Sequence, residues 1–225
     1  STINGAGILS NAANFGEGLL ISQDAGTGTL SSANRNTGFG YEVFDDLTSG
    51  DDNTAFGQQA LAALTTAGHN TAVGSNALEA NTTGAQNVAV GSLALDSATT
   101  ADNNVAVGYG SLGVNTTGAQ NIAIGSFSLD ANTTASNNVA IGYASLGSNT
   151  TASDNTAVGK FSLTANTTGA QNTVIGSSAG LALTTGSNNV AVGFEALKNE
   201  DAHGLNTAIG TQALFTQNAG ADAYN

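Results

Sequence analysis

The sequence predicts an all-β fold: a parallel β-roll or β-solenoid of about eleven 17-residue coils. The first observation is an Asn followed four residues later by a Gly, which recurs eleven times from Asn36–Gly40 to Asn206–Gly210 at a constant spacing of 17. The second is apolar alternation with β-branched residues between each Asn and Gly, which is typical of a strand. The third is a composition of 8% charged and 40% hydrophobic residues without Pro. Units this short bury a core only by stacking on their neighbours.

The period divides the chain into three parts. Residues 36–222 form the predicted solenoid repeat domain, and residues 223–225 are its C-terminal end. Residues 1–35 do not follow the period and carry apolar patches at Ile8-Leu9 and Leu19-Leu20-Ile21. An uncapped solenoid exposes a strand edge that recruits other chains. We therefore expect this N-terminal segment to be a cap or a strand that pairs with the next subunit, giving a head-to-tail polymer.

Each coil is expected to contain the same elements in the same order. The Asn column predicts a ladder of side-chain amides, and the Gly column predicts a bend with positive φ or a close backbone approach. Between them, the large apolar residue is expected to face the core and the central Ala to face outward. A second apolar column, mostly Leu, lies four residues after each Gly and predicts a short second strand before a polar loop. An outward stripe of Ala would let another backbone approach, so we expect lateral self-association.

The repeat positions interpreted as structural are those of the Asn column and the Gly column. They are represented by Asn53, Gly57, Asn70, Gly74, Asn87, Gly91, Asn104, Gly108, Asn121 and Gly125.

The charge of the chain excludes several classes of partner. The net charge is −13, with 16 acidic residues against Arg35, Lys160 and Lys198. Nucleic-acid binding is excluded because phosphate contacts need clustered Lys or Arg. No run of 18 apolar residues predicts membrane insertion. No signal-peptide pattern precedes the repeat, as expected of either a mature chain or a piece of a longer one.

The sequence predicts no catalytic residues and no metal ligands, so the protein is not expected to be an enzyme. His69 and His203, the only histidines, fall in polar loops away from any repeated carboxylate pattern. Asp45, Asp46, Asp51 and Asp52 form the densest acidic cluster. Oxygen-rich loops suit Ca²⁺, but the spacing lacks the ligand pattern of known calcium motifs. A solvated turn without a cofactor is the preferred interpretation, and calcium is the alternative.

Three further sets of residues are candidates for surface roles. Thr-Thr pairs recur in eight consecutive coils, which raises ice binding as an alternative, although adjacent Thr side chains on a strand point to opposite sides. Five pairs follow an Asn and form glycosylation sequons, with a turn as the alternative: Asn81, Asn115, Asn132, Asn149 and Asn166. Aromatic residues in variable columns suit recognition of a glycan or protein or burial between neighbouring chains: Tyr41, Tyr109, Tyr143, Phe194, Phe127 and Phe161.

The repeat also resembles a known family. The runs 87–91, 121–125 and 138–142 (Asn-x-Ala-Val/Ile-Gly) resemble the repeat of trimeric autotransporter adhesin heads, which are left-handed parallel β-rolls. The longer Asn-Thr-Thr-Gly spacer is similar to repeats in bacteriophage tail fibres. The resemblance implies a trimer, an extracellular setting and adhesive or structural work, and it supplies no catalytic residues. Family heads use a shorter repeat and continue into a coiled-coil stalk and a membrane anchor. No heptad pattern appears here, so the chain is a fragment or is not such an adhesin.

Together these observations predict a non-enzymatic structural subunit of an extracellular surface fibre or filament, serving attachment and assembled by lateral and end-to-end β contacts. The predicted partner is the chain itself, as a trimer or a head-to-tail polymer, with a host or surface glycan or protein as a further candidate. The predicted location is the cell surface or the virion surface. The alternative is the receptor-binding head of a trimeric adhesin or phage tail fibre, and a third candidate is an ice-binding solenoid.

Overall fold

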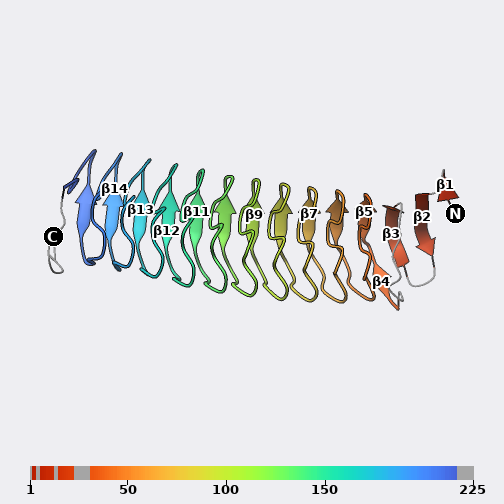
Figure 1. Ribbon diagram of the computed structural model, residues 1–225. Coiled ribbons are helices and arrows are strands. Elements are labelled where there is room, and N and C mark those ends of the chain that lie inside the picture. Colours follow the sequence, from red (N-terminus) through yellow and green to blue (C-terminus); the bar gives the residue numbers. More distant parts are fainter. Residues whose placement is uncertain (1, 4–5, 13–14, 23–30, 217–225) are drawn as a thin grey trace. The chain divides into compact units, whose positions relative to one another are not determined.

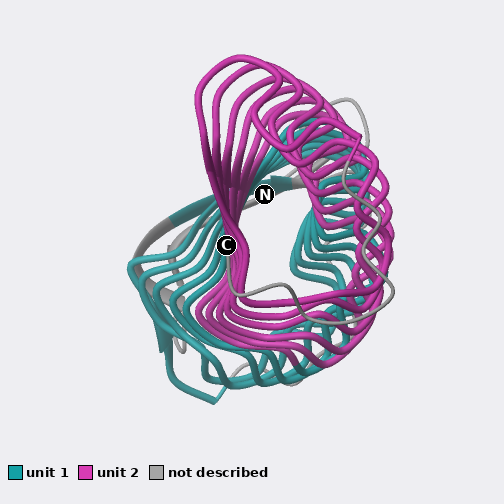
Figure 2. Cartoon of the chain, turned by 90° about the vertical axis from the view of Figure 1, so that its left-hand side faces the viewer, with its two compact units in different colours: residues 1–117 teal, residues 118–225 magenta. Residues whose placement is uncertain are grey.

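The computed structural model describes residues 2–3, 6–12, 15–22 and 31–216, with side chains described at 19–21 and 31–216. The chain divides into two compact units, residues 1–117 and residues 118–225 (Figure 2). Residues 217–222 of the predicted repeat domain and its predicted end, 223–225, lie outside the described residues.

The predicted parallel β-solenoid with a 17-residue pitch is confirmed (Figure 1). Each coil contributes one three-residue strand, which pairs in parallel with the strand of the next coil. Thr71 pairs with Val88 in the first unit, and Ile122 pairs with Val139 in the second. The first unit contains β5 (Thr37–Phe39), β6 (Thr54–Phe56), β7 (Thr71–Val73), β8 (Val88–Val90) and β9 (Val105–Val107). The second unit contains β10 (Ile122–Ile124), β11 (Val139–Ile141), β12 (Thr156–Val158), β13 (Thr173–Ile175), β14 (Val190–Val192) and β15 (Thr207–Ile209).

The predicted direction of the strand side chains was wrong. The central strand residue, which is Ala in most coils, is buried, as at Ala89 and Ala140, whereas the large apolar residue that follows faces outward. The interior of a 17-residue coil is narrow, and the Leu column already fills much of it, as Leu95 and Leu146 do at 0% exposure. Only a small side chain from the strand fits against Leu, so the larger Val, Ile and Phe side chains take the outer face.

The predicted second strand was also wrong, because the residues after each Gly form turns in the described coils. Two left-handed residues curl the chain there, for example Asn76 (φ 59°) and Leu78 (φ 52°). Leu in this conformation costs roughly 1–2 kcal/mol, and the same φ of 50–53° recurs at every Leu of the column. The turn points each Leu into the coil, and burial of a Leu side chain contributes about 1.5–3 kcal/mol, which offsets the strain.

The predicted Asn ladder is confirmed within each unit. Asn155 Oδ1 accepts hydrogen bonds from the backbone N–H (3.0 Å) and from Nδ2 (3.2 Å) of Asn172 in the next coil. Asn155 Nδ2 in turn donates to the carbonyl of Gly169 at 2.9 Å. These Asn side chains are buried, so the ladder satisfies polar groups that water cannot reach.

The Gly column has both predicted features, a positive φ and a close backbone approach. Gly74 has φ +139°, and a Cβ at this position would lie 2.5 Å from the carbonyl oxygen of Gly91 in the next coil. Gly125 has φ +131° and the same approach to Gly142. No other residue adopts this backbone without strain.

The described part of the N-terminal segment pairs with the first coil. It comprises β1 (Thr2–Ile3), β2 (Ala6–Ala12), β3 (Phe15–Ser22) and β4 (Ala33–Asn34). β1, β2 and β3 are antiparallel, and β3 then runs parallel to β5, with Leu20 opposite Gly38. The strand column therefore begins at Leu19–Ile21, one coil earlier than the 17-residue period indicates, because the offset here is 18 residues. No helix among the described residues is long and apolar enough to cross a membrane.

Candidate interaction surfaces

The outer face of the strands is an uncharged and mainly apolar surface in each unit. The third strand residue forms its main column: Phe39, Phe56, Val73, Val90 and Val107 in the first unit, and Ile124, Ile141, Val158, Ile175, Val192 and Ile209 in the second. Phe56 is 53% exposed and Ile141 is 36% exposed. The first strand residue adds a parallel column of Thr, Val and Ile. We call these two columns the outer strand face.

Phe39 and Phe56 begin the outer strand face with a stacked pair. Their ring centroids lie 5.0 Å apart with an interplanar angle of 13°. The two stacked rings present more apolar area at the surface than the Val side chains that follow them in the column.

The aromatic residues predicted as recognition candidates are at the surface. Tyr41, Tyr109, Tyr143, Phe127 and Phe194 are exposed, and Phe161 is half-buried. The structure brings three of them together in the second unit: Tyr143 packs edge-on against Phe127 (6.1 Å) and Phe161 (5.4 Å). Lys160 Nζ lies 4.9 Å from the Phe161 ring centroid. We call Phe127, Tyr143, Lys160 and Phe161 the aromatic cluster.

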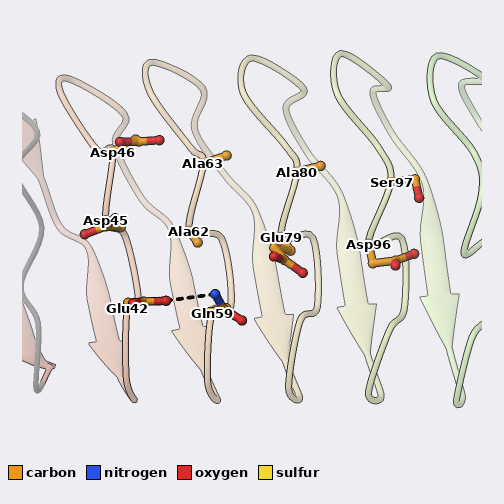
Figure 3. Close-up of a pocket in the computed structure, with 10 residues that line it drawn as sticks. All are labelled: Glu42, Asp45, Asp46, Gln59, Ala62, Ala63, Glu79, Ala80, Asp96 and Ser97. Atoms are coloured by element: carbon orange, nitrogen blue, oxygen red, sulfur yellow. Dashed lines mark hydrogen bonds between the residues drawn. The ribbon is translucent and has the colours of Figure 1, made fainter.

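An acidic groove crosses four coils of the first unit (Figure 3). Its carboxylates are Glu42, Asp45, Asp46, Glu79 and Asp96. Gln59 donates to Glu42 at 2.8 Å, which links the first two coils of the groove. Burial raises the pKa of Asp96, and the neighbouring charge of Glu79 raises it further. This groove concentrates negative charge on one side of the first unit.

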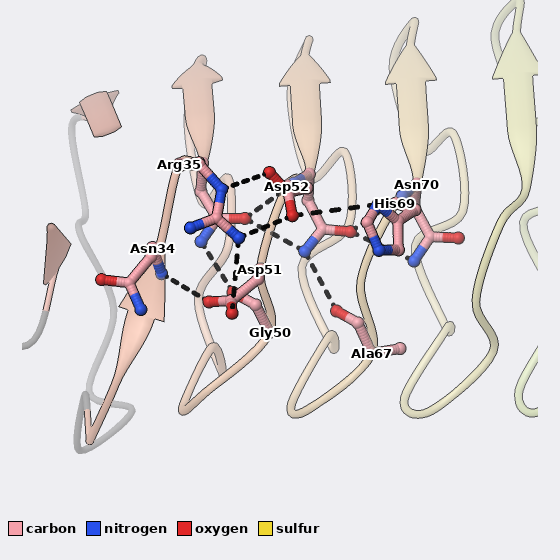
Figure 4. A network of polar contacts seen from close by, with 10 residues as sticks. Asn34, Arg35, Gly50, Asp51, Asp52, Ala67, His69 and Asn70 are labelled. Atoms are coloured by element: carbon pink, nitrogen blue, oxygen red, sulfur yellow. Dashed lines mark hydrogen bonds and ion pairs between the residues drawn. The ribbon is translucent and has the colours of Figure 1, made fainter. Parts of the chain in front are cut away.

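The candidate calcium ligands are divided between two environments. Asp45 and Asp46 line the acidic groove, whereas Asp52 is bound by Arg35 at 2.6 and 2.8 Å (Figure 4). Asp51 accepts a hydrogen bond from the backbone N–H of Asn34 at 2.7 Å and lies 3.8 Å from the Arg35 guanidinium. The hydrogen bond from Arg35 lowers the pKa of Asp52. Within residues 31–216, these four carboxylates do not come together as a group of three metal ligands, which speaks against the calcium alternative.

The structure also speaks against glycan attachment at the five sequons. Asn81, Asn115, Asn132, Asn149 and Asn166 are fully buried. Their Nδ2 groups hold the loop: Asn81 donates to the carbonyl of Gly84 at 2.8 Å, and Asn149 to that of Ala152 at 3.0 Å. A glycan on Nδ2 would require these bonds to break and the loop to open. The turn alternative therefore fits the geometry.

The two Thr residues of each pair have different surroundings. The first donates its hydroxyl to the next coil, as Thr82 Oγ1 does to the carbonyl of Thr99 at 3.0 Å. The second, such as Thr83, is exposed. Each coil thus presents one exposed Thr of the pair, and the hydroxyl of the other is held by the solenoid itself.

The histidines do not stand apart from carboxylates as the sequence led us to expect. His69 Nδ1 lies 3.9 Å from Asp52, and His203 Nδ1 lies 2.9 Å from Glu200 Oε1. Glu200 is fully buried. This contact was not predicted from the sequence, because Glu200 stands where the sequon column has Asn in other coils, and the three-residue spacing of Glu200 and His203 appears in only one coil.

Comparisons of the chain with models of protein families, with curated proteins and with solved structures give no match, so the fold and these surfaces are defined by the chain's own sequence and geometry.

Proposed function

We propose that this protein is a non-enzymatic structural subunit of an extracellular surface fibre, and that its chains associate side by side through the outer strand face. The observation that carries the proposal is the column of Val, Ile and Phe side chains in each unit, every one of which is exposed or half-buried. Monomeric proteins rarely leave large contiguous apolar patches in water, and such patches mark interaction sites. None of the residues in β5–β15 is charged, although the chain carries a net charge of −13.

A second copy of the chain is the partner that this face fits best. The side chains of the outer strand face recur once per coil, at the spacing of paired strands, about 4.8 Å. Another solenoid of the same pitch presents ridges at the same interval, so contacts formed by one coil repeat in every coil. The favourable terms then add along the contact, at roughly 25 cal/mol for each Å² of apolar area removed from water.

End-to-end growth would use the ends of the strand stack. β3 covers the edge of β5, and β1 is the terminal strand of the first unit's sheet. Strand addition at an N-terminal end would therefore involve β1. The similarity of the repeat to adhesin heads supports a trimer, an extracellular location and a role in attachment.

The test is the assembly state of the purified chain, measured by light scattering after size-exclusion chromatography and by electron microscopy. The natural sequence should associate side by side into species larger than a monomer, and these should extend into filaments under the microscope. The double variant Val73→Asp, Val90→Asp places two charges on the outer strand face and should shift the protein to monomers. The control His69→Asp, Gln86→Asp adds the same two carboxylates at exposed loop positions and should assemble normally. A monomeric natural chain at micromolar concentration, or equal assembly of both double variants, would contradict the proposal.

The aromatic cluster favours a second candidate, a receptor-binding head. Tyr143 lies between Phe127 and Phe161 at the surface, with Lys160 beside them. Exposed rings stack well on sugar faces and on protein partners. Microscopy separates the two functions: filaments support the fibre, and discrete trimers about one domain long support the head. In the second case Tyr143→Ala should abolish attachment to the target surface, whereas Tyr109→Ala in the other unit should not.

A further inference from the structure

The loop between β14 and β15 contains the one group of three metal-ligand side chains among the described residues. Glu200, Asp201 and His203 each offer a ligand atom, and these atoms lie within 4.8 Å of one another. His203 Nδ1 is 2.9 Å from Glu200 Oε1, and the backbone N–H of His203 donates to the same oxygen at 3.0 Å. Glu200 is fully buried, His203 is half-buried and Asp201 is exposed, so the group has a buried side and an open side.

The second carboxylate oxygen of Glu200 is buried without a partner. Oε2 is inaccessible to solvent and accepts no hydrogen bond. Leaving a buried acceptor unsatisfied costs about 1–3 kcal/mol, and more if the group is charged. Buried charges in proteins are paired or bind metals. Glu200 therefore lacks a positive group on its second oxygen.

The repeat shows which interactions are lost where Glu200 replaces an Asn. At the same position in other coils an Asn performs two tasks: Asn81 Oδ1 accepts from the N–H of Gly84, and Asn81 Nδ2 donates to the carbonyl of the same residue. Glu200 accepts the equivalent hydrogen bond from the backbone N–H of His203. An ionised carboxylate has no hydrogen to donate, so it cannot make the second hydrogen bond, to the His203 carbonyl. Exchanging Asn for Glu thus disrupts a satisfied turn and adds a charge.

The backbone around the three side chains is held by the neighbouring coil. The carbonyl of Asp201 accepts bonds from the backbone N–H and the hydroxyl of Thr184, both at 2.5 Å. The carbonyl of His203 accepts a bond from Nδ2 of Asn189 at 3.2 Å. Ligands on a fixed backbone lose little conformational entropy when an ion binds.

We propose that Glu200, Asp201 and His203 bind a divalent transition-metal ion, with Zn²⁺ as the best match. One imidazole nitrogen and two carboxylates are a ligand set that Zn²⁺ accepts, and three protein ligands leave one position open in tetrahedral coordination. Imidazole favours Zn²⁺ and its neighbours over Ca²⁺ and Mg²⁺, which prefer all-oxygen sites. The exposed Asp201 side chain has the freedom to move inward and complete the site. The ion supplies the positive charge that Glu200 Oε2 lacks.

Calorimetric titration of the full metal-free chain with ZnCl₂ tests the proposal. We expect one Zn²⁺ per chain and a melting temperature that rises with Zn²⁺ concentration, because an ion that binds only the folded state stabilises it. Co²⁺ should bind at the same site and give visible absorption bands. Ca²⁺ should bind at least about tenfold more weakly than Zn²⁺.

Variants at the three positions should abolish this response. Glu200→Gln and His203→Ala should each weaken Zn²⁺ binding by well over tenfold, and the matched control His69→Ala should bind Zn²⁺ as the natural chain does. Glu200→Gln should not lower the melting temperature without metal, since it removes the buried charge. If that variant fails to fold, Asp201→Asn at an exposed position gives the same test. Absence of stoichiometric Zn²⁺ binding, or equal loss in His69→Ala and His203→Ala, would overturn the proposal.

Discussion

Val174 fills the space that Gly180 leaves open in the same coil. A Cβ added to Gly180 would lie 3.3 Å from Val174 Cγ1, and both residues are buried. In other coils of the second unit these positions are Ala and Leu, as at Ala157 and Leu163. The coil that contains β13 has therefore exchanged volume between its strand and its turn, at nearly constant packing.

This pair should show strong energetic coupling. Val174→Ala leaves a cavity and Gly180→Leu overfills the coil, so each single change should destabilise the protein by about 1–3 kcal/mol. The double variant restores the usual pair and should be more stable than the sum of the single effects by about 1–3 kcal/mol. Urea denaturation and amide hydrogen exchange measure these differences.

An outward Val on the next strand provides the control. Val190→Ala combined with Gly180→Leu should give additive effects, because Val190 faces away from the core. Additivity in the Val174 pair as well would contradict the proposed exchange of volume.

The same exchange shows how far the fold could be predicted from sequence. The period, the strands, the Asn ladder and the Gly bends were all predictable, because each follows from one column. Which strand side chains face the core was predicted wrongly, because that prediction used side-chain size alone. Comparing columns would have corrected it: Gly38 occurs with Phe44, and Val174 occurs with Gly180. Opposite changes in size indicate that the Ala and Leu columns face each other. A Cβ on Gly38 would indeed lie 2.9 Å from Phe44 Cδ2.

The candidate surfaces were less predictable than the fold. The exposure of Tyr143 and Phe127 could be predicted because their columns vary in size and polarity. The contact of Glu200 with His203 could not, since only the fold shows that position 200 is buried. The departure from Asn at this position was the available signal, and it gains meaning only when the turn geometry is known.

The Asn ladder should be essential to the stability of the second unit. Asn155→Ala removes the acceptor for two donors of Asn172 and the donor for Gly169. Each buried group left unsatisfied costs about 1–3 kcal/mol, so we expect a loss of roughly 2–5 kcal/mol by urea denaturation. Thr168→Ala removes an exposed side chain and should change stability by less than about 0.5 kcal/mol. A loss below 1 kcal/mol in Asn155→Ala would show that water replaces the ladder.

Two glycines in one coil should differ sharply in their tolerance of Ala. Gly142 has φ +132°, and a Cβ there would lie 2.5 Å from the carbonyl oxygen of Gly159. Gly142→Ala should therefore cost more than about 3 kcal/mol, from the backbone conformation and the displaced coil together. The nearest atom to a Cβ on Gly147 is 3.3 Å away, and its φ lies outside the left-handed region. Gly147→Ala should change stability by no more than about 1 kcal/mol, so similar losses at both sites would contradict the stacking geometry.

The pH dependence of stability should reveal two opposite kinds of carboxylate. Burial raises the pKa of Asp96 and of Asp130 above the usual 3.8, so the folded state binds these protons more tightly than the unfolded state does. Their favourable contribution is complete below pH 3.8 and is lost as the pH rises through the folded pKa. Asp96→Asn and Asp130→Asn should therefore raise the melting temperature at pH 7 and have little effect below pH 3.8.

Asp52 is the opposite case, because the hydrogen bond from Arg35 lowers its pKa. Its contribution is present above pH 3.8 and is lost as the pH falls through the folded value, so Asp52→Asn should lower the melting temperature at pH 7. Melting curves of the three variants between pH 3 and 7 measure this, and a shift of the same sign for Asp96→Asn and Asp52→Asn at pH 7 would refute it.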